Sequence, residues 1–451
     1  MSKSIRIGNG QGFWGDSIDA PVRLLRGGPI DYITMDYLAE VTMSIMQRQK
    51  LKRPDRGYAH DFVAFIDKVL PELVERNVKV IANAGGVNPE ACQKALMDVA
   101  AKHGLKGVKI ATVTGDDILD RLEDFGRQGE KFANMDTGEG LFDKERHILS
   151  ANVYAPTNGI VEALDQGAQI VVTGRGTDPG LVLGPMIHEF GWDWADWDKL
   201  ALGTVAGHIL ECGAQCTGGN FTNWEEVPNM ADIGYPIVEV NDRGEVVITK
   251  HDSQGGLVTI DTVSEQLLYE MGDPNDYITP DVVVDFTSIQ LEDLGNDRVA
   301  VKNVKGKPKT DFYKVSISYL NGFKATGQLT VSGPNAYQKA HKCAEILWTR
   351  LEAAGYSYDD QLTEYLGVGV CHEGIRHQDD PPEVVLRVGV KDQDKARVDR
   401  FGKEIAPLVT SGPPGVTGFA GGRPKAQEIV AYWPALLRKE LIDVHVNVTE
   451  V

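Results

Sequence analysis

Short apolar runs alternate with amphipathic patterns through the first half of the chain. The runs are rich in β-branched residues and apolar throughout, which is typical of strands buried on both faces. They cover residues 5–8, 32–35, 78–82, 108–113, 149–153 and 169–173. Between them, stretches such as 88–103 and 157–166 repeat apolar residues at helical spacing. Strands separated by helices in this way predict a parallel sheet with helices on both faces.

The pattern changes near residue 234. From there the chain consists of short β-branched runs separated by turn residues, which predicts a β-rich segment. From residue 333 onward helical patterns return between strand-like runs, an order typical of a small α+β domain. We therefore expect an α/β protein in three parts: a Rossmann-like, doubly wound and mostly parallel domain at 1–233, a β-rich segment at 234–332 and an α+β C-terminal domain at 333–451.

The composition is that of a globular protein that works on small molecules. With 451 residues the chain is long enough for two or three domains, and a formal charge of −19 argues against nucleic acid as a partner. No apolar run reaches the roughly 18 residues that a membrane helix needs, and the N-terminus lacks the apolar core of an export signal. The five cysteines form no CxxC pair. We therefore expect a cytoplasmic location without membrane contact.

Glycine-rich loops follow several of the predicted strands. In parallel sheets ligands bind beyond the carboxyl ends of the strands, and the bare N–H groups of such loops can hold an anion. An arginine between glycines, as at Arg175, can reach a carboxylate with its two-pronged donor face. A purely structural turn before a helix is the alternative for each loop. The candidate substrate-binding residues here are Gly12, Asp16, Asn83, Gly85, Gly86, Arg175 and Asp178.

Residues 203–220 combine more reactive groups than any other stretch. A short apolar helix carries His208, Glu211 and Cys212, and residues three or four apart share one helix face. A proton carrier, a carboxylate and a thiol are thus gathered beside a Gly-Gly turn. A buried histidine on a packed helix is the alternative interpretation of His208. We expect His208, Glu211, Cys212 and Lys250, which precedes a further Gly-Gly turn, to be catalytic, and Gln215, Gly218 and Gly219 to bind substrate.

Neither a metal nor a nicotinamide cofactor is expected from the motifs. The histidines and cysteines meet no standard zinc spacing, and the run CHEGIRH at 371–377 differs from HExxH. Residues 10–15 match GxGxxG after a strand, and Asp36 ends the next strand, which is the pattern of a dinucleotide-binding fold. Because Phe13 and Trp14 crowd that turn, we do not expect NAD(P), nor any other required cofactor.

Several segments, in this order along the chain, resemble the acyclic terpene utilisation (AtuA) family of bacterial catabolic proteins. They include GFWGDS at 12–17, NAGGVNP at 83–89, VVTGRGTDPGLVLGP at 171–185, GTVAGHILECGAQCTGGNF at 203–221 and ITKHDSQGGLVT at 248–259. The resemblance implies a role in pathways for terpenes such as citronellol and geraniol, which proceed through CoA thioesters of branched unsaturated acids. Longer relatives carry an extra ferredoxin-like segment, which implies a possible small ferredoxin-like partner subunit for this chain.

Taken together, residues and resemblance predict a cytoplasmic catabolic enzyme that acts on a small carboxylic acid or an acyl-CoA. Addition or removal of water, a lyase reaction, is the favoured chemistry, because it needs a proton carrier, a second acid or base and donors for an enolate-like oxygen. Arg175 would hold the substrate carboxylate, and glycine N–H groups would hold the oxygen. Acyl transfer through Cys212, a nicotinamide-dependent oxidoreductase and a non-catalytic subunit stay as alternatives. We also expect a homo-oligomer.

Overall fold

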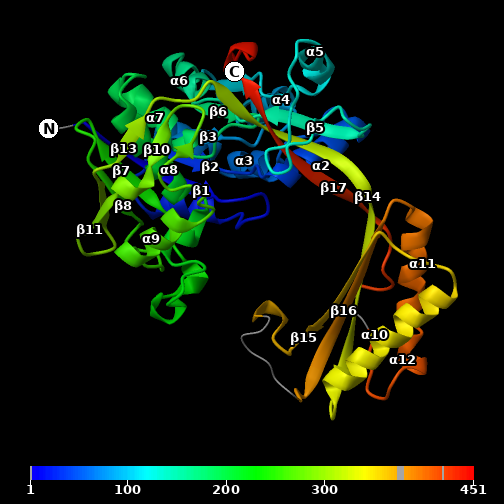
Figure 1. Cartoon of the computed structure of the whole chain (residues 1–451). Helices are drawn as coiled ribbons and strands as arrows, with labels where there is room; N and C mark the ends of the chain where they lie inside the picture. Colours follow the sequence, from blue (N-terminus) through cyan, green and yellow to red (C-terminus); the bar gives the residue numbers. More distant parts are fainter. Residues whose placement is uncertain (1–2, 373–379, 419–420) are drawn as a thin grey trace. The chain divides into compact units, whose positions relative to one another are not determined.

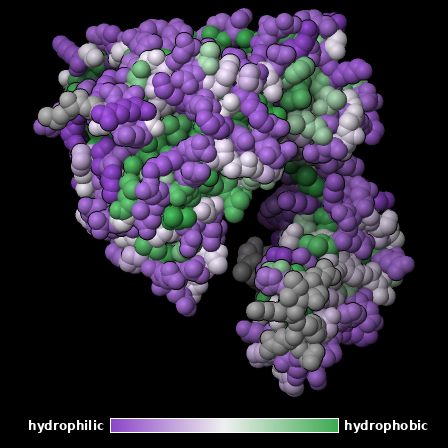
Figure 2. Space-filling model, turned by 60° about the vertical axis from the view of Figure 1, so that its left-hand side comes forward, coloured by the Kyte–Doolittle hydropathy of each residue, from purple (hydrophilic) through white to green (hydrophobic). Residues whose placement is uncertain are grey.

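The computed structural model describes residues 3–372, 380–418 and 421–451, and they form two compact units. The first unit comprises Met1–Ser318 with Tyr432–Val451, and the second comprises Tyr319–Ala431. No helix within the described residues is long and apolar enough to cross a membrane. Figure 2 shows one face, on which most of the surface is hydrophilic, in keeping with the net charge of −19.

A sheet of ten strands, counted over the described residues, is the backbone of the first unit. Its central strands are parallel to one another, and antiparallel strands continue it at both edges. In spatial order the strands are β11 (Gln290–Asp293), β12 (Val299–Lys302), β8 (Val246–Thr249), β7 (Ile237–Asn241), β1 (Ser4–Gln11), β2 (Tyr32–Met35), β3 (Lys79–Ala82), β6 (Ile170–Thr173), β4 (Lys109–Thr114) and β18 (His445–Glu450).

The α/β class is therefore confirmed, but the sheet is mixed instead of mostly parallel. The parallel order β1-β2-β3-β6-β4 comes from strands joined by helical crossovers, as the sequence predicts. The antiparallel part arises because β7 pairs with the free edge of β1, and β8, β12 and β11 then follow as neighbours. The β7–β8 and β11–β12 pairs are local hairpins, but the pairings of β7 with β1 and of β12 with β8 join distant segments, so no local pattern predicts them.

Helices cover both faces of this sheet, because alternate strand residues point to opposite sides. Within β2 and β3, Ile33 and Val80 belong to one apolar core, and Tyr32 and Ile81 belong to the other. Figure 1 shows the helices on the two sides of the strands. The first core is closed by α1 (Ala20–Gly27), α3 (His60–Glu75) and α4 (Pro89–Lys102), and the second by α6 (Asn158–Asp165), α7 (Gly180–Phe190) and α8 (Trp197–Leu210).

The segment predicted as a separate β-rich part, residues 234–332, is distributed over three sheets. Its strands β7, β8, β11 and β12 extend the main sheet. A small antiparallel sheet is formed by β13 (Lys305–Lys307), β10 (Val283–Asp285) and β9 (Tyr277–Ile278), after helix α9 (Ile260–Leu268). The long strand β14 (Phe312–Ser332) begins in the first unit and continues into the second. It also pairs with β5 (Ile148–Val153), which stands outside the main sheet.

The second unit has strands on one side and helices on the other, an α+β arrangement. Its sheet has the order β15 (Asp360–Leu366), β16 (Glu383–Asp392), β14 and β17 (Gln427–Arg438). Helices α10 (Ala336–Ala353), α11 (Lys395–Ile405) and α12 (Leu408–Ser411) supply the rest of its apolar core. The unit begins at Tyr319, and the last strand, β18, returns to the first unit, so its ends differ from the predicted 333–451.

Candidate active site

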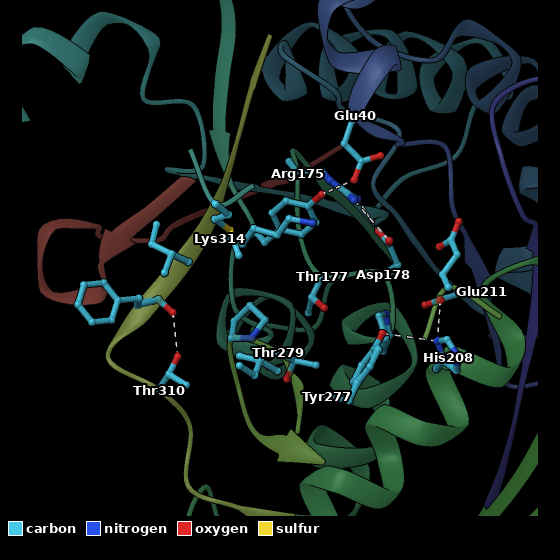
Figure 3. Close-up of a pocket in the computed structure, with 18 residues that line it drawn as sticks. Glu40, Arg175, Thr177, Asp178, His208, Glu211, Tyr277, Thr279, Thr310 and Lys314 are labelled. Carbon is cyan, nitrogen blue, oxygen red and sulfur yellow. Dashed lines mark hydrogen bonds and ion pairs between the residues drawn. The ribbon is translucent and has the colours of Figure 1, made fainter. Parts of the chain in front are cut away.

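Loops at the carboxyl edge of the parallel strands surround a cavity of about 440 Å³ in the first unit (Figure 3). The loop after β6, the end of α8 and the start of helix α2 (Glu40–Lys52) contribute its polar residues. Residues between Glu270 and Lys314, together with Met135, Tyr154 and Leu436, form the remaining wall. The lining residues used below are Glu40, Met135, Tyr154, Arg175, Asp178, His208, Glu211, Glu270, Tyr277, Ile278, Phe312, Lys314 and Leu436.

The end of α8 carries a buried histidine–carboxylate pair. His208 is 1% exposed, and its Nδ1 lies 3.0 Å from Oε1 of Glu211, one helical turn further on. The hydroxyl of Tyr277 lies 3.5 Å from the same nitrogen. Aromatic rings of Tyr277 and Phe286 pack against the imidazole, each with its centroid 5.4 Å away. The other carboxylate oxygen, Oε2 of Glu211, is buried and has no hydrogen-bond partner among the described residues.

Burial and mutual attraction set the charges of this pair. Burial alone disfavours protonation of His208, but the Glu211 carboxylate outweighs it, so the pKa of the imidazole is raised above its usual value. Burial raises the pKa of the Glu211 carboxyl to about 7, although His208 opposes the shift. Asp178 and Glu270 add to the rise through like-charge repulsion. The pair therefore joins a carboxyl that titrates near neutral pH to an imidazole whose protonated form is favoured.

The loop after β6 brings Arg175 and Asp178 into the cavity as an ion pair. Arg175 is 2% exposed, and both of its terminal nitrogens face the Asp178 carboxylate. Its guanidinium lies 4.2 Å from the ring centroid of Tyr154, and its backbone N–H donates to Oδ2 of Asp116 at 2.8 Å. Arg175 is thus held on three sides, and its charge is already balanced by Asp178.

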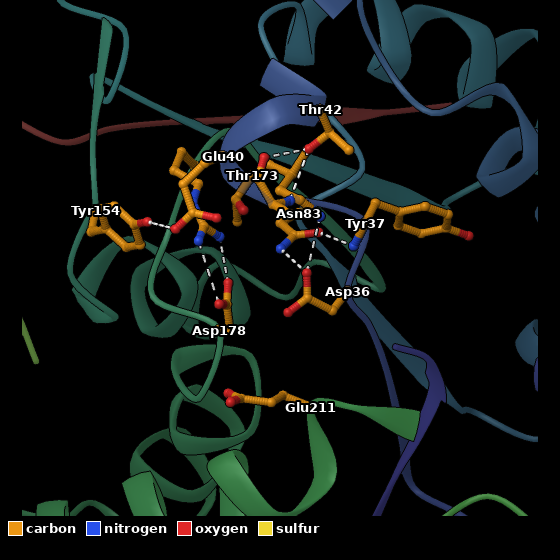
Figure 4. A network of polar contacts seen from close by, with 12 residues as sticks. Asp36, Tyr37, Glu40, Thr42, Asn83, Tyr154, Thr173, Asp178 and Glu211 are labelled. Atoms are coloured by element: carbon orange, nitrogen blue, oxygen red, sulfur yellow. Dashed lines mark hydrogen bonds and ion pairs between the residues drawn. The ribbon is translucent and has the colours of Figure 1, made fainter. Parts of the chain in front are cut away.

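A second carboxylate, Glu40, lies at the start of α2 on the same side of the cavity (Figure 4). The Tyr154 hydroxyl donates to its Oε1 at 2.7 Å. Burial favours the neutral acid, but the Tyr154 hydrogen bond and the charges of Arg175 and Lys314 outweigh it and lower the pKa of Glu40. Glu40 is therefore an anion at neutral pH, in contrast with Glu211.

A second cavity of about 500 Å³ lies against the loops after β1 and β2. Gly12, Cys212 and Gln215 line it, together with Phe13 and Trp14. It shares Glu40, Arg175, Asp178, Glu211 and Glu270 with the first cavity, so these five residues stand between the two spaces. Burial raises the pKa of the Cys212 thiol to about 12, which makes it a neutral thiol at physiological pH.

Asp36, at the end of β2, also lines the second cavity and is fixed from the loop after β3. Asn83 donates from Nδ2 to its Oδ1 at 2.7 Å, and the Leu38 N–H donates to the same oxygen at 3.0 Å (Figure 4). Burial and the nearby Asp178 raise its pKa well above the usual range. Asn83 thus orients Asp36 through its side-chain amide, and the side-chain oxygen of Asn83, Oδ1, accepts the Tyr37 N–H at 2.7 Å.

The glycine pairs predicted to hold an oxyanion direct their N–H groups into the protein. Gly85 donates to the Thr173 carbonyl at 3.1 Å, and Gly86 donates to the Asn83 carbonyl at 3.3 Å. Gly218 and Gly219 donate to carbonyls of their own turn at 3.3 and 2.9 Å. A side chain at Gly85 would approach the Thr173 carbonyl to 2.6 Å. Close packing is the reason for these glycines, and none of the four lines either cavity.

Two further predicted site residues lie away from both cavities. Asp16 closes the first loop, since its carboxylate accepts the Gly12 N–H at 3.0 Å and the Tyr235 hydroxyl at 2.6 Å. Lys250 is buried, with Nζ 3.0 Å from Asp297 and 3.0 Å from the Gln254 carbonyl. Both residues tie loops together.

Reasoning from sequence missed several cavity residues. Glu40, Tyr154, Tyr277 and Lys314 come from four separate segments, and none of them stands in a glycine-rich motif. Two local signals existed: Tyr154 directly follows a predicted strand, β5, and Glu40 and Tyr277 lie in segments that resemble the AtuA family, DYLAE at 36–40 and VSEQLLYEMGDPNDYITPDV at 263–282. Their importance depends on what they approach in space, which a local pattern does not contain.

No group of three or more histidine, cysteine or acidic side chains in the described parts of the chain is arranged to hold a metal ion. Residues 373–377 of the CHEGIRH run lie outside the described residues.

The fold and site define an α/β protein with an acid–base cavity at the carboxyl edge of its sheet. The chain matches the family model described as "Acyclic terpene utilisation family protein AtuA" over residues 5–448, and it belongs to that family. This membership supports a catabolic role. A search of curated proteins finds no match, and a search of the solved structures finds none either.

Proposed function

We propose that this protein is a catabolic enzyme that adds water to, or removes it from, a small carboxylic acid or its CoA thioester. The observation that carries the proposal is Oε2 of Glu211. A buried carboxylate oxygen without a partner is costly, and this one belongs to a residue that lines two cavities and titrates near neutral pH. A general base for water has these properties.

In the hydration direction, Glu211 takes a proton from water while the water oxygen bonds to the β-carbon of an unsaturated acyl group. The electron pair of the carbon–carbon double bond moves toward the carbonyl, giving an enolate-like oxygen. The Glu211–His208 pair, which now holds the proton taken from water, delivers one proton to the α-carbon and so returns to its starting state. The carbon–carbon bond is then single, and the β-carbon carries the new hydroxyl. Dehydration is the reverse sequence, with the same proton balance.

His208 has the second role in this scheme. Its Nδ1 lies 3.0 Å from the Glu211 carboxylate, so a protonated imidazole stabilises the ionised base and can return a proton to the product. The hydroxyl of Tyr277, which lines the same cavity and lies 3.5 Å from that nitrogen, is the donor that we assign to the enolate oxygen. The glycine N–H groups are not used for this oxygen, because they already donate within the protein.

The test is incubation with a panel of acyl-CoAs and free unsaturated or hydroxylated acids, read by mass spectrometry. The expected result is a product that differs from one substrate by the mass of one water molecule. Incubation in ¹⁸O-labelled water checks that the added oxygen comes from solvent. Turnover of a panel member by a different change, such as hydride transfer on addition of NADH or NADPH, would contradict the proposal.

A further inference from the structure

The first cavity has a second, apolar side whose residues the proposed reaction does not use. Met135, Ile278, Phe312 and Leu436 all line it, and all four are more than 40% exposed. Large apolar side chains that are exposed and grouped together mark a binding surface more often than scattered ones do. The four residues, named here the apolar rim, come from four separate segments of the first unit.

Lys314 lies next to the apolar rim, two residues after Phe312 on β14. Its side chain is exposed, and its Nζ is 5.0 Å from the ring centroid of Tyr154 and 5.9 Å from that of Tyr432. No carboxylate among the described residues forms an ion pair with it. In Figure 3, Lys314 and Thr310 lie on the opposite side of the cavity from His208 and Glu211.

Arg175, which also lines the cavity, differs from Lys314 because it already has a carboxylate partner. Arg175 is buried, and its terminal nitrogens are already engaged by Asp178. Binding of a substrate anion at these two nitrogens would require Asp178 to give up its partner inside the protein, which is unfavourable. The third nitrogen, Nε, has no partner among the described residues, but it is buried. The charge of Lys314 contributes to the lowered pKa of Glu40, but the two form no ion pair, so an anion can bind Lys314 without breaking one. The ammonium group is also oriented by the two tyrosine rings.

We infer that Lys314 and the apolar rim form a binding site for an amphiphilic anion, with Lys314 at the anionic group and the rim around the hydrocarbon. The inference rests on the proposed function for its ligand class, a carboxylic acid or CoA thioester. The anionic group is then either the carboxylate of the free acid or the phosphates of CoA. In this arrangement Arg175, paired with Asp178, is a structural part of the cavity wall and does not hold the substrate carboxylate.

Calorimetric titration of the full-length protein tests this site with ligands that cannot be hydrated. The probes are octanoate, octanoyl-CoA, CoA alone and octan-1-ol. Lys314→Met removes the charge, and Lys324→Met, at an exposed position further along the same strand, is the matched control. We expect Lys314→Met to weaken binding of octanoate or octanoyl-CoA by about tenfold or more, because a hydrogen bond to a charged group is lost. Octan-1-ol should bind both variants as it binds the wild type.

The two sources of the anion give different results. Weaker binding of octanoate identifies the carboxylate, whereas weaker binding of octanoyl-CoA and CoA, with octanoate unaffected, identifies the phosphates. Unchanged binding of all these anions by Lys314→Met, or equal losses in Lys324→Met, would overturn the inference.

The apolar rim is tested by chain length. The affinity of the wild type for straight-chain acids is expected to rise about fourfold per added methylene between butanoate and octanoate. Phe312→Ser and Leu436→Ser should each reduce this gain, whereas Leu51→Ser, at a more exposed site on α2 outside the cavity, should not. A gain that is the same in all variants would remove the rim from the site. Since none of these probes reacts, a failure of hydration activity would leave these results unaffected.

Discussion

Two pairs in the first unit join a buried basic side chain to a carboxylate but differ in their surroundings, His208 with Glu211 and Lys250 with Asp297. In the lysine pair every partner is protein: Lys250 reaches Asp297 and the Gln254 carbonyl, each at 3.0 Å, and the other Asp297 oxygen accepts the Val258 N–H at 2.9 Å. In the histidine pair one Glu211 oxygen has no partner and the residue lines two cavities. Burial and pairing alone therefore do not mark a reactive group. What distinguishes the histidine pair is a carboxylate oxygen that has no partner in the described parts of the chain and belongs to a residue lining the cavities.

The largest expected effect is on turnover. His208→Ala and Glu211→Gln should each lower kcat by about 10²–10⁴-fold, the usual contribution of a general acid or base, while the fold is kept. Steady-state kinetics on the substrate found in the panel, with circular dichroism as the folding check, measure this. A near-normal rate in either variant would show that the His208–Glu211 pair is not catalytic. It would then be a structural pair, like Lys250 and Asp297.

The pH dependence of kcat/KM should also show that the histidine pair, and not the lysine pair, takes part in the reaction. Activity needs Glu211 ionised, and because burial raises its pKa from 4.5 to about 7, kcat/KM should rise with pH through about 7. It should fall again at higher pH, where His208, whose pKa is also raised by the neighbouring carboxylate, loses its proton. The two midpoints belong to the coupled pair.

Asp116 provides the control for this profile. Burial raises its pKa to about 7 as well, but it hydrogen-bonds to Asn152 and the Arg175 backbone and does not line the main cavity. Asp116→Asn should therefore keep the rising limb near the same pH. Loss of the rising limb in Asp116→Asn would show that this limb reports the titration of Asp116 and not that of Glu211.

A smaller effect, on stability, is expected at the lysine pair. Lys250→Met leaves Asp297 and the Gln254 carbonyl without their partner, at a cost of about 2 kcal/mol in the free energy of unfolding. Urea denaturation measures this loss, and kcat per folded molecule should stay within about twofold of wild type, since Lys250 lines neither cavity. A large loss of kcat with unchanged stability would show that the comparison is wrong.

The smallest effect is expected at Cys212. Because burial keeps its thiol neutral, with a pKa of about 12, Cys212→Ala should change kcat by no more than about twofold. Trapping with a radiolabelled acyl-CoA, which would leave an acyl group on a nucleophilic cysteine, provides a second readout. A loss of two orders of magnitude in Cys212→Ala, or a trapped acyl group, would favour acyl transfer over hydration.

Local patterns predicted much of the fold. The strand-like run at 32–35 coincides with β2, and the helical pattern at 88–103 contains α4, which begins at Pro89. Periodicity works here because burial imposes it on each element separately. The pairing of β7 with β1 was beyond such reasoning, since it joins residues more than 200 positions apart.

The candidate site also has one part that local sequence predicts and another that depends on long-range contacts. His208 and Glu211 are three residues apart on one helix, so their proximity follows from helix geometry alone. Tyr154 and Glu40 meet across 114 positions. The glycines at 85 and 86 were predicted to bind substrate, but the sequence does not state whether a bare backbone serves a ligand or, as their N–H bonds and close contacts indicate, internal packing.

The sequence by itself determined the α/β class, the family and the short-range pairing of an imidazole with a carboxylate. Tertiary structure decided which buried charges are satisfied by protein and which are left to a cavity. The physical reason is that helix and strand periodicity act over a few residues, whereas desolvation and ion pairing depend on every segment that packs nearby. In the sequence, Lys250 and Glu211 are both charged residues that precede a Gly-Gly turn. Only their surroundings in the folded protein distinguish the structural residue from the reactive one.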